Sequence, residues 1–235
     1  MTMNFTRIII LAASVKRQNY CVAGKKWHQN QARIWLRPVG NSLPDGNNAL
    51  TSKEIQYHSN RIPSTLDVVD LQFLRSANHN VQSENYLIDT AFKWDKKGTY
   101  PVEKLYEILD TPETLWFVNR EDTNSRMGIN DCFPTQFLAG PTNSLYFILI
   151  NKLIIHLTHE EDFYGKNRKR YRGSFNYNGV NYKLSITDPN IYSQYGQLQD
   201  GDYNYGKCYA TISMAPLEDN GNCYKFLAAL FKFKV

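Results

Sequence analysis

The stretch RYRGSFNYNGVNYKLSIT, residues 170–187, decides the fold class of this 235-residue chain. Its central Asn178-Gly179 pair is typical of a two-residue type I′ turn between antiparallel strands. A two-residue turn pairs Tyr177 with Val180. Because side chains alternate between the two faces of a strand, one face of the resulting hairpin is apolar. Similar runs of aromatic and β-branched residues recur along the chain, separated by Asn, Gly, Asp and Pro. The pattern predicts an all-β protein.

Two groups of strands are expected, on either side of a loop-rich stretch at residues 119–143. The expected strands lie at about 5–13, 20–27, 31–39, 66–75 and 84–91, and then at about 144–157, 168–177, 180–187, 207–214 and 222–234. Short helices are expected as insertions, one opened by a capping box at Thr51 and one beginning at Pro101. The order predicts two OB-like five-stranded barrels in tandem, over residues 1–140 and 141–235.

Composition limits the cellular location, the metal content and the partners that we expect for this chain. No apolar run reaches the ~18 residues that a membrane span needs, and the start of the chain lacks the basic region of a secretory signal. The four cysteines lie far apart with no paired spacing, which argues against a zinc site and a disulfide framework. We therefore expect a cytoplasmic protein with no membrane contact and no metal. The net charge of +5 favours an anionic partner.

Segments spread over almost the whole chain carry a resemblance to known proteins. They are ILAASVKRQNYCVAGKKW (10–27), IWLRPV (34–39), LDVVDLQFL (66–74), SENYLID (83–89), ILDTPETLW (108–116), MGIND (127–131), RYRGSFNYNGVNYKLSITDP (170–189) and NCYKFLAALF (222–231). Together, and in this order, they resemble the prokaryotic dual OB-domain family. The resemblance implies a pair of OB-like barrels and a nucleic-acid-binding role, often in a defence or mobile-element setting. It implies no particular reaction.

A basic segment, KNRKRYR at residues 166–172, precedes the predicted turn. The hairpin register points a row of cations outward together, with Lys183 on the same face; the row is Lys166, Arg168, Arg170 and Arg172. Such a row suits a phosphate backbone, because each neutralised phosphate releases counterions. The alternative is a solvated basic loop. Tyr209 is expected to face outward from another strand of this barrel and to offer a stacking surface.

The first barrel carries a second candidate surface. Arg33, Trp35 and Arg37 alternate with apolar residues, so one face of their strand is aromatic and basic. Trp can stack on a base, and Arg can bind phosphate. The alternative is that Trp35 fills the barrel while Arg37 forms an internal ion pair with Asp67 or Asp70.

Catalytic motifs are not found. HLTHE at residues 156–160 differs from H-E-x-x-H, and the chain has no P-loop, no G-x-S-x-G and no G-x-G-x-x-G. We therefore predict a non-enzymatic protein without a cofactor that binds single-stranded DNA or RNA, as an accessory or sensor component of a prokaryotic antiviral defence system. The alternative is a protein-interaction or nucleotide-signal-sensing module that docks a separate effector enzyme.

Overall fold

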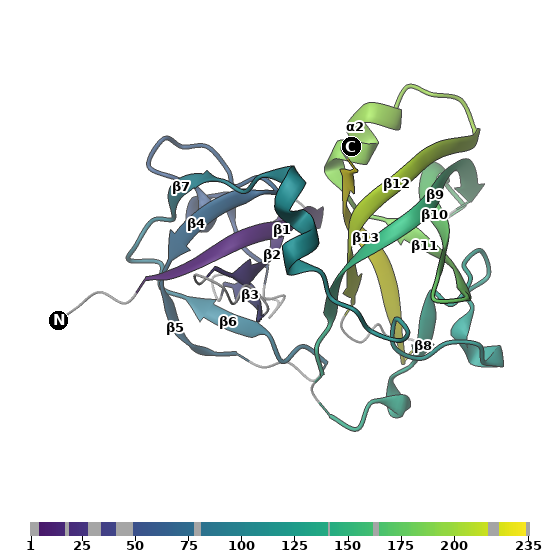
Figure 1. Ribbon diagram of the computed structural model, residues 1–235, viewed down its shortest axis with the longest axis horizontal. Helices are drawn as coiled ribbons and strands as arrows, with labels where there is room; N and C mark the ends of the chain where they lie inside the picture. Colours follow the sequence, from purple (N-terminus) through teal and green to yellow (C-terminus); the bar gives the residue numbers. More distant parts are fainter. Residues whose placement is uncertain are drawn as a thin grey trace. The chain divides into compact units, whose positions relative to one another are not determined.

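The computed structural model describes residues 5–16, 19–27, 34–40, 49–77, 81–140, 142–161, 165–215 and 221–233. The chain forms two compact units. The first contains Met1–Leu109 and Gly140–Ser144, and the second contains Asp110–Ala139 and Leu145–Val235. Residues 110–139, expected in the first barrel, thus pack with the second unit. Each unit consists mainly of β-strands with a few short helices (Figure 1).

The first unit is built on a seven-stranded sheet with the order β5-β6-β3-β2-β1-β4-β7. Its elements are β1 Thr6–Lys16, β2 Asn19–Lys26, β3 Trp35–Val39, α1 Ser52–Ile55, β4 Asp67–Leu71, β5 Phe73–Ser76, β6 Asn85–Ile88, β7 Asp95–Thr99 and the 3-10 helix η1 Val102–Ile108. Only Gln72 separates β4 from β5. Because β4 pairs with β1 and β5 pairs with β6, this nearly continuous strand closes the sheet into a barrel. β7 extends the edge at β4.

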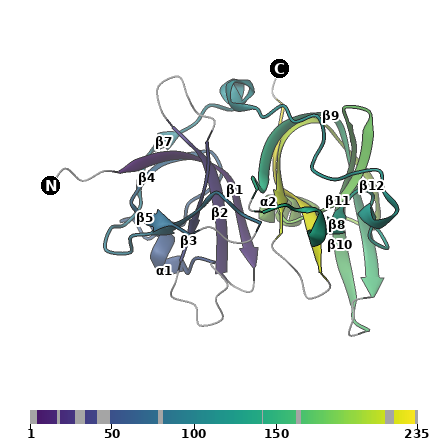
Figure 2. The same cartoon turned by 90° about the horizontal axis from the view of Figure 1, so that it is seen from below.

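The second unit is built on a six-stranded sheet with the order β11-β10-β9-β12-β13-β8. Its elements are η2 Glu121–Thr123, β8 Cys132–Pro134, η3 Thr135–Phe137, β9 Leu145–Glu161, β10 Asn167–Tyr177, β11 Val180–Ile186, α2 Pro189–Tyr195, β12 Gly201–Met214 and β13 Asn222–Lys232. A parallel pairing of β11 with β13 closes strands β9–β13 into a barrel. The long strand β9 is curved, as the wall of a closed barrel requires (Figure 2).

The two barrels share one connectivity. In each barrel, three antiparallel strands are followed by a short helix and two further strands, with the nearly continuous β4 and β5 counted as one, and the second of these strands lies parallel to the third strand of the barrel. β7 and β8 lie outside this shared pattern. In the first unit β6 is parallel to β3, and in the second β13 is parallel to β11. Five strands closed in this manner form the OB barrel. The prediction of an all-β fold with OB-like barrels and short helical insertions is confirmed.

The central hairpin has the predicted register. Phe175 pairs with Tyr182, and Gly173 pairs with Leu184. Asn178 and Gly179 adopt positive φ angles of 48° and 83°, as a type I′ turn requires. The apolar face of the hairpin packs in the core, where Leu184 is fully buried. The opposite face therefore points away from the barrel interior.

Some elements were not predicted. A local signal does mark α2, because the Asp188 carboxylate caps it by accepting a hydrogen bond from the Asn190 amide at 2.9 Å, and Pro189 occupies the first turn. β7 has the sequence DKKGT and lacks an apolar face, so only its pairing with β4 makes it a strand.

Three further observations concern both units. Within the described ranges, no helix is long and apolar enough to cross a bilayer. All four cysteines are free thiols, and burial raises the pKa of Cys208 to about 12 and the pKa of Cys132 and Cys223 to about 11. The part of the chain that the structure describes brings no three His, Cys, Asp or Glu residues together as a metal site.

Candidate nucleic-acid interface

The outer surface of β10 carries the basic row. Arg168 lies opposite Glu160 of β9, Arg170 lies opposite Thr158, and Arg172 lies opposite His156. Along the other edge of β10, Ser174 lies opposite Lys183 of β11. Directly opposed residues project from the same side of a sheet, so these side chains form one polar surface. We call it the β10 face, made up of His156, Thr158, Glu160, Arg168, Arg170, Arg172, Ser174, Lys183, Ser185 and Asp202.

The cations of the row differ in exposure. Lys166, Arg168 and Arg170 are exposed, and Lys183 is half-buried. Arg172 departs from the expectation of a solvated outward cation, because its Nη1 contacts Glu160 Oε1 and its side chain is only 13% exposed. The sequence did not predict this ion pair, which joins residues on neighbouring strands.

Glu160 is held in its ionised form. Partial burial opposes ionisation, but hydrogen bonds from Thr158 and Arg172, together with the charges of Arg172 and Arg170, outweigh it and lower the pKa of Glu160. Thr158 donates to Glu160 Oε1 at 2.8 Å. A negative charge therefore sits within the row and offsets part of its positive potential.

A hydrogen-bonded chain of three side chains crosses the same face. Asp202 Oδ1 of β12 lies 2.6 Å from His156 Nδ1, and His156 Nε2 lies 2.7 Å from Ser174 Oγ. An ionised carboxylate can only accept, so His156 Nδ1 donates to Asp202, and in the neutral imidazole Nε2 is then the acceptor for the Ser174 hydroxyl. The three residues come from three strands, so no local motif could have revealed them.

Trp35 does not offer the expected stacking surface. Arg33 lies outside the described residues, and Trp35 is only 6% exposed, in a strand flanked by β2 and β6. The Nζ of Lys25, itself fully buried, lies 5.3 Å from the centre of the indole ring and donates to the Ile108 carbonyl oxygen at 2.7 Å. Trp35 is therefore a buried packing residue, on the side of β3 opposite Leu36 of the core cluster.

Arg37 is likewise an internal residue. Its Nη2 lies 3.2 Å from Glu84 Oε1 and donates to Ser144 Oγ at 2.9 Å. Burial lowers the pKa of Arg37, and the Glu84 carboxylate acts against that effect. Asp67 and Asp70, the partners considered from sequence, bind other side chains instead. Trp35 and Arg37 therefore do not form the expected aromatic and basic surface.

Tyr209 is also buried, contrary to its expected exposure. It is 4% exposed, its ring stacks on Phe147 with centroids 5.9 Å apart, and Phe233 lies 5.5 Å away. The alternation of β12 is as predicted, because Cys208 and Ala210 on either side of Tyr209 line the barrel core. An aromatic cluster covers the opposite face, so facing away from the barrel does not mean facing water.

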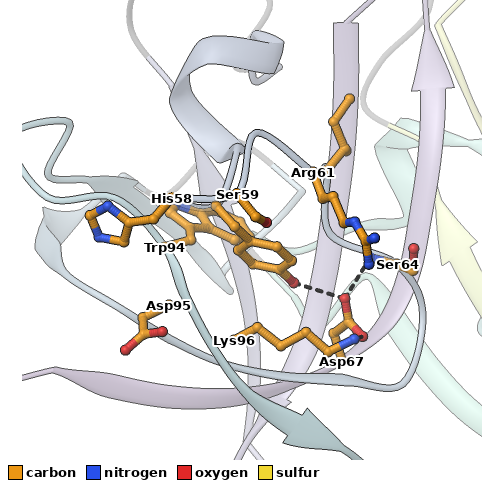
Figure 3. A pocket seen from close by; sticks show the side chains of 10 residues that line it. His58, Ser59, Arg61, Ser64, Asp67, Trp94, Asp95 and Lys96 are labelled. Carbon is orange, nitrogen blue, oxygen red and sulfur yellow. Dashed lines mark hydrogen bonds and ion pairs between the residues drawn. The ribbon is translucent and has the colours of Figure 1, made fainter.

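A cavity in the first unit was not predicted. Its volume is about 380 Å³, and it is lined by Tyr57, His58, Ser59, Arg61, Ile62, Ser64, Asp67, Trp94, Asp95 and Lys96. Figure 3 shows Arg61 and Lys96 extending toward Asp67. The Tyr57 hydroxyl donates to Asp67 Oδ2 at 2.8 Å, and burial together with this carboxylate raises the pKa of Tyr57. Loop and strand residues far apart in sequence form this cavity.

Comparison with known proteins agrees with the architecture. The family profile described as a dual OB-containing domain matches residues 6–230. No curated protein and no solved structure matches the chain.

Proposed function

The chain belongs to the dual OB-containing domain family, and from that premise we propose that it binds single-stranded DNA or RNA through the β10 face. OB folds bind oligonucleotides on the surface of their second and third strands, the places that β10 and β11 hold in the second barrel. One observation carries the proposal: Arg168 and Arg170 are exposed two positions apart on β10, and Lys183 of β11 lies opposite Ser174 on the same face.

The proposed contacts are with the phosphate backbone. Trp35 and Tyr209, the stacking candidates from sequence, are buried and have no open ring face for a base. Arg168 and Arg170 can each approach a phosphate, and every such contact adds a salt-dependent contribution that is independent of base sequence. The proposed binding is therefore tolerant of base sequence and sensitive to salt.

The test is a titration of fluorescent oligo(dT) and oligo(U) at several salt concentrations. Replacing Arg168 and Arg170 by Gln should weaken binding about tenfold and reduce the salt slope by about 1.4, or ~0.7 for each contact with a single strand. The matched control replaces two exposed cations elsewhere in the second unit, Arg126 and Lys232, by Gln. An unchanged slope in the Arg168 and Arg170 variant, or an equal loss in the control, would rule out the β10 face.

We also propose an accessory or sensor role in prokaryotic antiviral defence, with nucleic acid as the signal and a separate enzyme as the effector. The family resemblance supports this setting. In cells that express the chain together with its effector enzyme, the Arg168 and Arg170 variant should lose phage protection, and the Arg126 and Lys232 variant should retain it. Equal protection by both variants would separate the β10 face from any defence role.

The cavity of the first unit favours a second candidate function, the sensing of a nucleotide signal. Its volume of about 380 Å³ falls in the range of small-molecule sites, and Tyr57 supplies an aromatic wall. Arg61 can pair with a phosphate, and Lys96 can do so when it exchanges its ion pair with Asp67 for the ligand. Calorimetric titration with a panel of mono-, di- and cyclic nucleotides tests this function. Binding that is lost in Arg61→Gln supports it, and no heat with any nucleotide excludes it.

A further inference from the structure

We propose that Ser174, His156 and Asp202 form a nucleophilic relay that cleaves phosphodiesters held on the β10 face. The substrate class rests on the proposed function, because the same cations would bring a phosphate to this surface. The relay itself rests on the geometry of three side chains and goes against the sequence expectation of a non-enzymatic protein.

The spacing is that of a nucleophile, a general base and a residue that orients the base. Ser174 Oγ lies 2.7 Å from His156 Nε2, and His156 Nδ1 lies 2.6 Å from Asp202 Oδ1. Both distances fall within the range for proton transfer along such a chain. The side chain of His156 is 17% exposed, so its ring is shielded from most of the solvent but is not sealed off. Asp202 acts as a positioning residue that fixes the imidazole tautomer.

Two cations flank the nucleophile. Lys183 is directly opposite Ser174 across β10 and β11, and residues in that relation have Cβ atoms ~5 Å apart. Arg172 is two positions earlier on the same side of β10, where its ion pair with Glu160 offsets part of its charge. A lysine next to a hydroxyl nucleophile stabilises the charge that develops on the oxygens of a transferred phosphoryl group, and Arg172 adds to this effect when a phosphate displaces Glu160. An anionic phosphodiester therefore suits this surface better than a neutral ester does.

The reaction balances without a metal or a redox partner. A lone pair of Ser174 Oγ attacks phosphorus, the Oγ–P bond forms, and the hydroxyl proton passes to His156 Nε2. The bond from phosphorus to the departing alcohol oxygen breaks, and that oxygen takes the proton from Nε2. Water then attacks the phosphorus of the serine-linked diester, which still carries its second ester group, and gives a proton to Nε2. The Oγ–P bond breaks, Oγ recovers its proton from Nε2, and the product leaves as a phosphate monoester.

The competing explanation is structural. His156 links β10 to β12 through its two ring nitrogens, and such a link stabilises a sheet without any reactivity at Ser174. The two explanations differ in the nucleophilicity of one hydroxyl. That property can be measured without knowing the natural substrate.

The experiment treats the full chain with a fluorophosphonate probe, whose phosphorus accepts a serine oxygen and loses fluoride. Mass spectrometry of the tryptic peptide GSFNYNGVNYK, residues 173–183, locates the adduct. We expect labelling at Ser174 in preference to Ser185, a serine on the same face, and a labelling rate at least about 100-fold lower in His156→Gln. Asp202→Ala should also slow labelling, and Asp202→Glu should restore part of the rate.

Turnover of bis(4-nitrophenyl) phosphate, a phosphodiester without nucleic acid, tests the substrate class. It should be lost in Ser174→Ala and kept in Ser185→Ala. No adduct at Ser174, or equal labelling in His156→Gln, overturns the relay, and labelling without diester turnover overturns the substrate class. Oligonucleotide binding is measured separately, so a reactive protein that binds no oligonucleotide refutes the proposed function alone, and an unreactive protein that binds refutes the relay alone.

Discussion

Glu160 and Arg172 form an ion pair between β9 and β10, in which Glu160 Oε1 contacts Arg172 Nη1. Both side chains are mostly shielded from water, with exposed fractions of 17% and 13%. The pair places a carboxylate inside a row of cations. It relieves repulsion between Arg172 and Arg170 in the unbound protein and opposes the approach of a phosphate.

Glu160→Gln should therefore strengthen oligonucleotide binding. Removing the carboxylate leaves the positive charge of Arg172 uncompensated, and we expect affinity to rise about two- to fivefold at low salt. The control is Glu161→Gln, which removes an exposed carboxylate from the next position of β9, on the opposite side of the strand. Fluorescence anisotropy with oligo(dT) measures both. Weaker binding by Glu160→Gln than by the control would contradict the arrangement.

Lys225 should make stability depend on pH. It is 1% exposed, and its Nζ donates to the carbonyl oxygens of Phe117 at 2.6 Å and Asn130 at 2.9 Å. Burial lowers its pKa to about 7, against 10.5 for an unperturbed lysine. Between these values the unfolded chain binds more protons than the folded one, so the unfolding free energy contributed by Lys225 rises with pH.

The measurement is urea denaturation from pH 6 to 8, below the range in which the thiols titrate in the unfolded chain. Wild type should gain stability relative to Lys225→Met by about 1 kcal/mol per pH unit above pH 7. Lys225→Met leaves two carbonyl oxygens without their donor, and this loss is offset near pH 6 because the variant no longer buries a charged ammonium. Lys152→Met, at an exposed lysine of β9, serves as the control and should follow wild type. Parallel curves for wild type and Lys225→Met would show that burial leaves the lysine titration unchanged.

Gly128 should not tolerate a side chain. A β-carbon there would lie 1.9 Å from Asp131 Oδ2. The carboxylate cannot move aside freely, because it accepts hydrogen bonds from the Ser125 amide at 2.7 Å and from the Ser125 hydroxyl at 2.6 Å. Gly128→Ala should lower the unfolding free energy by about 2 kcal/mol or more. In Gly98→Ala, the control, the added methyl meets no atom within 4 Å. Equal stability of the two variants would mean that the Asp131 loop yields.

Trp35 should matter for stability and not for nucleic-acid binding. Trp35→Leu removes a buried ring and should cost about 2–4 kcal/mol in unfolding free energy. Oligonucleotide affinity, measured well below the unfolding transition, should change less than about twofold, since loss of a stacked base would cost ~1–3 kcal/mol. A folded variant with a tenfold loss of affinity would place Trp35 in the interface.

Much of the fold followed from local pattern. The Asn178-Gly179 turn set the hairpin register, and alternation placed Phe175 inside the barrel and Arg170 outside. Two strands escaped prediction because β7 is polar and β8 spans only Cys132–Pro134, so their pairing partners define them. Most of the site could not be predicted in this manner. Arg172 faces the predicted side, but its ion pair depends on a carboxylate from another strand.

The side of a strand on which a residue lies could be predicted from the amino-acid pattern, because alternation is a property of the local backbone. The neighbours that cover that side are set by the packing of distant segments. Tyr209 faces away from its barrel core yet is buried against Phe147, and Arg37 of β3 pairs with Glu84, which directly precedes β6. His156 meets Ser174 and Asp202 only because β9 lies between β10 and β12. Burial and partnership depend on contacts between residues distant in the chain, and no local period encodes those contacts.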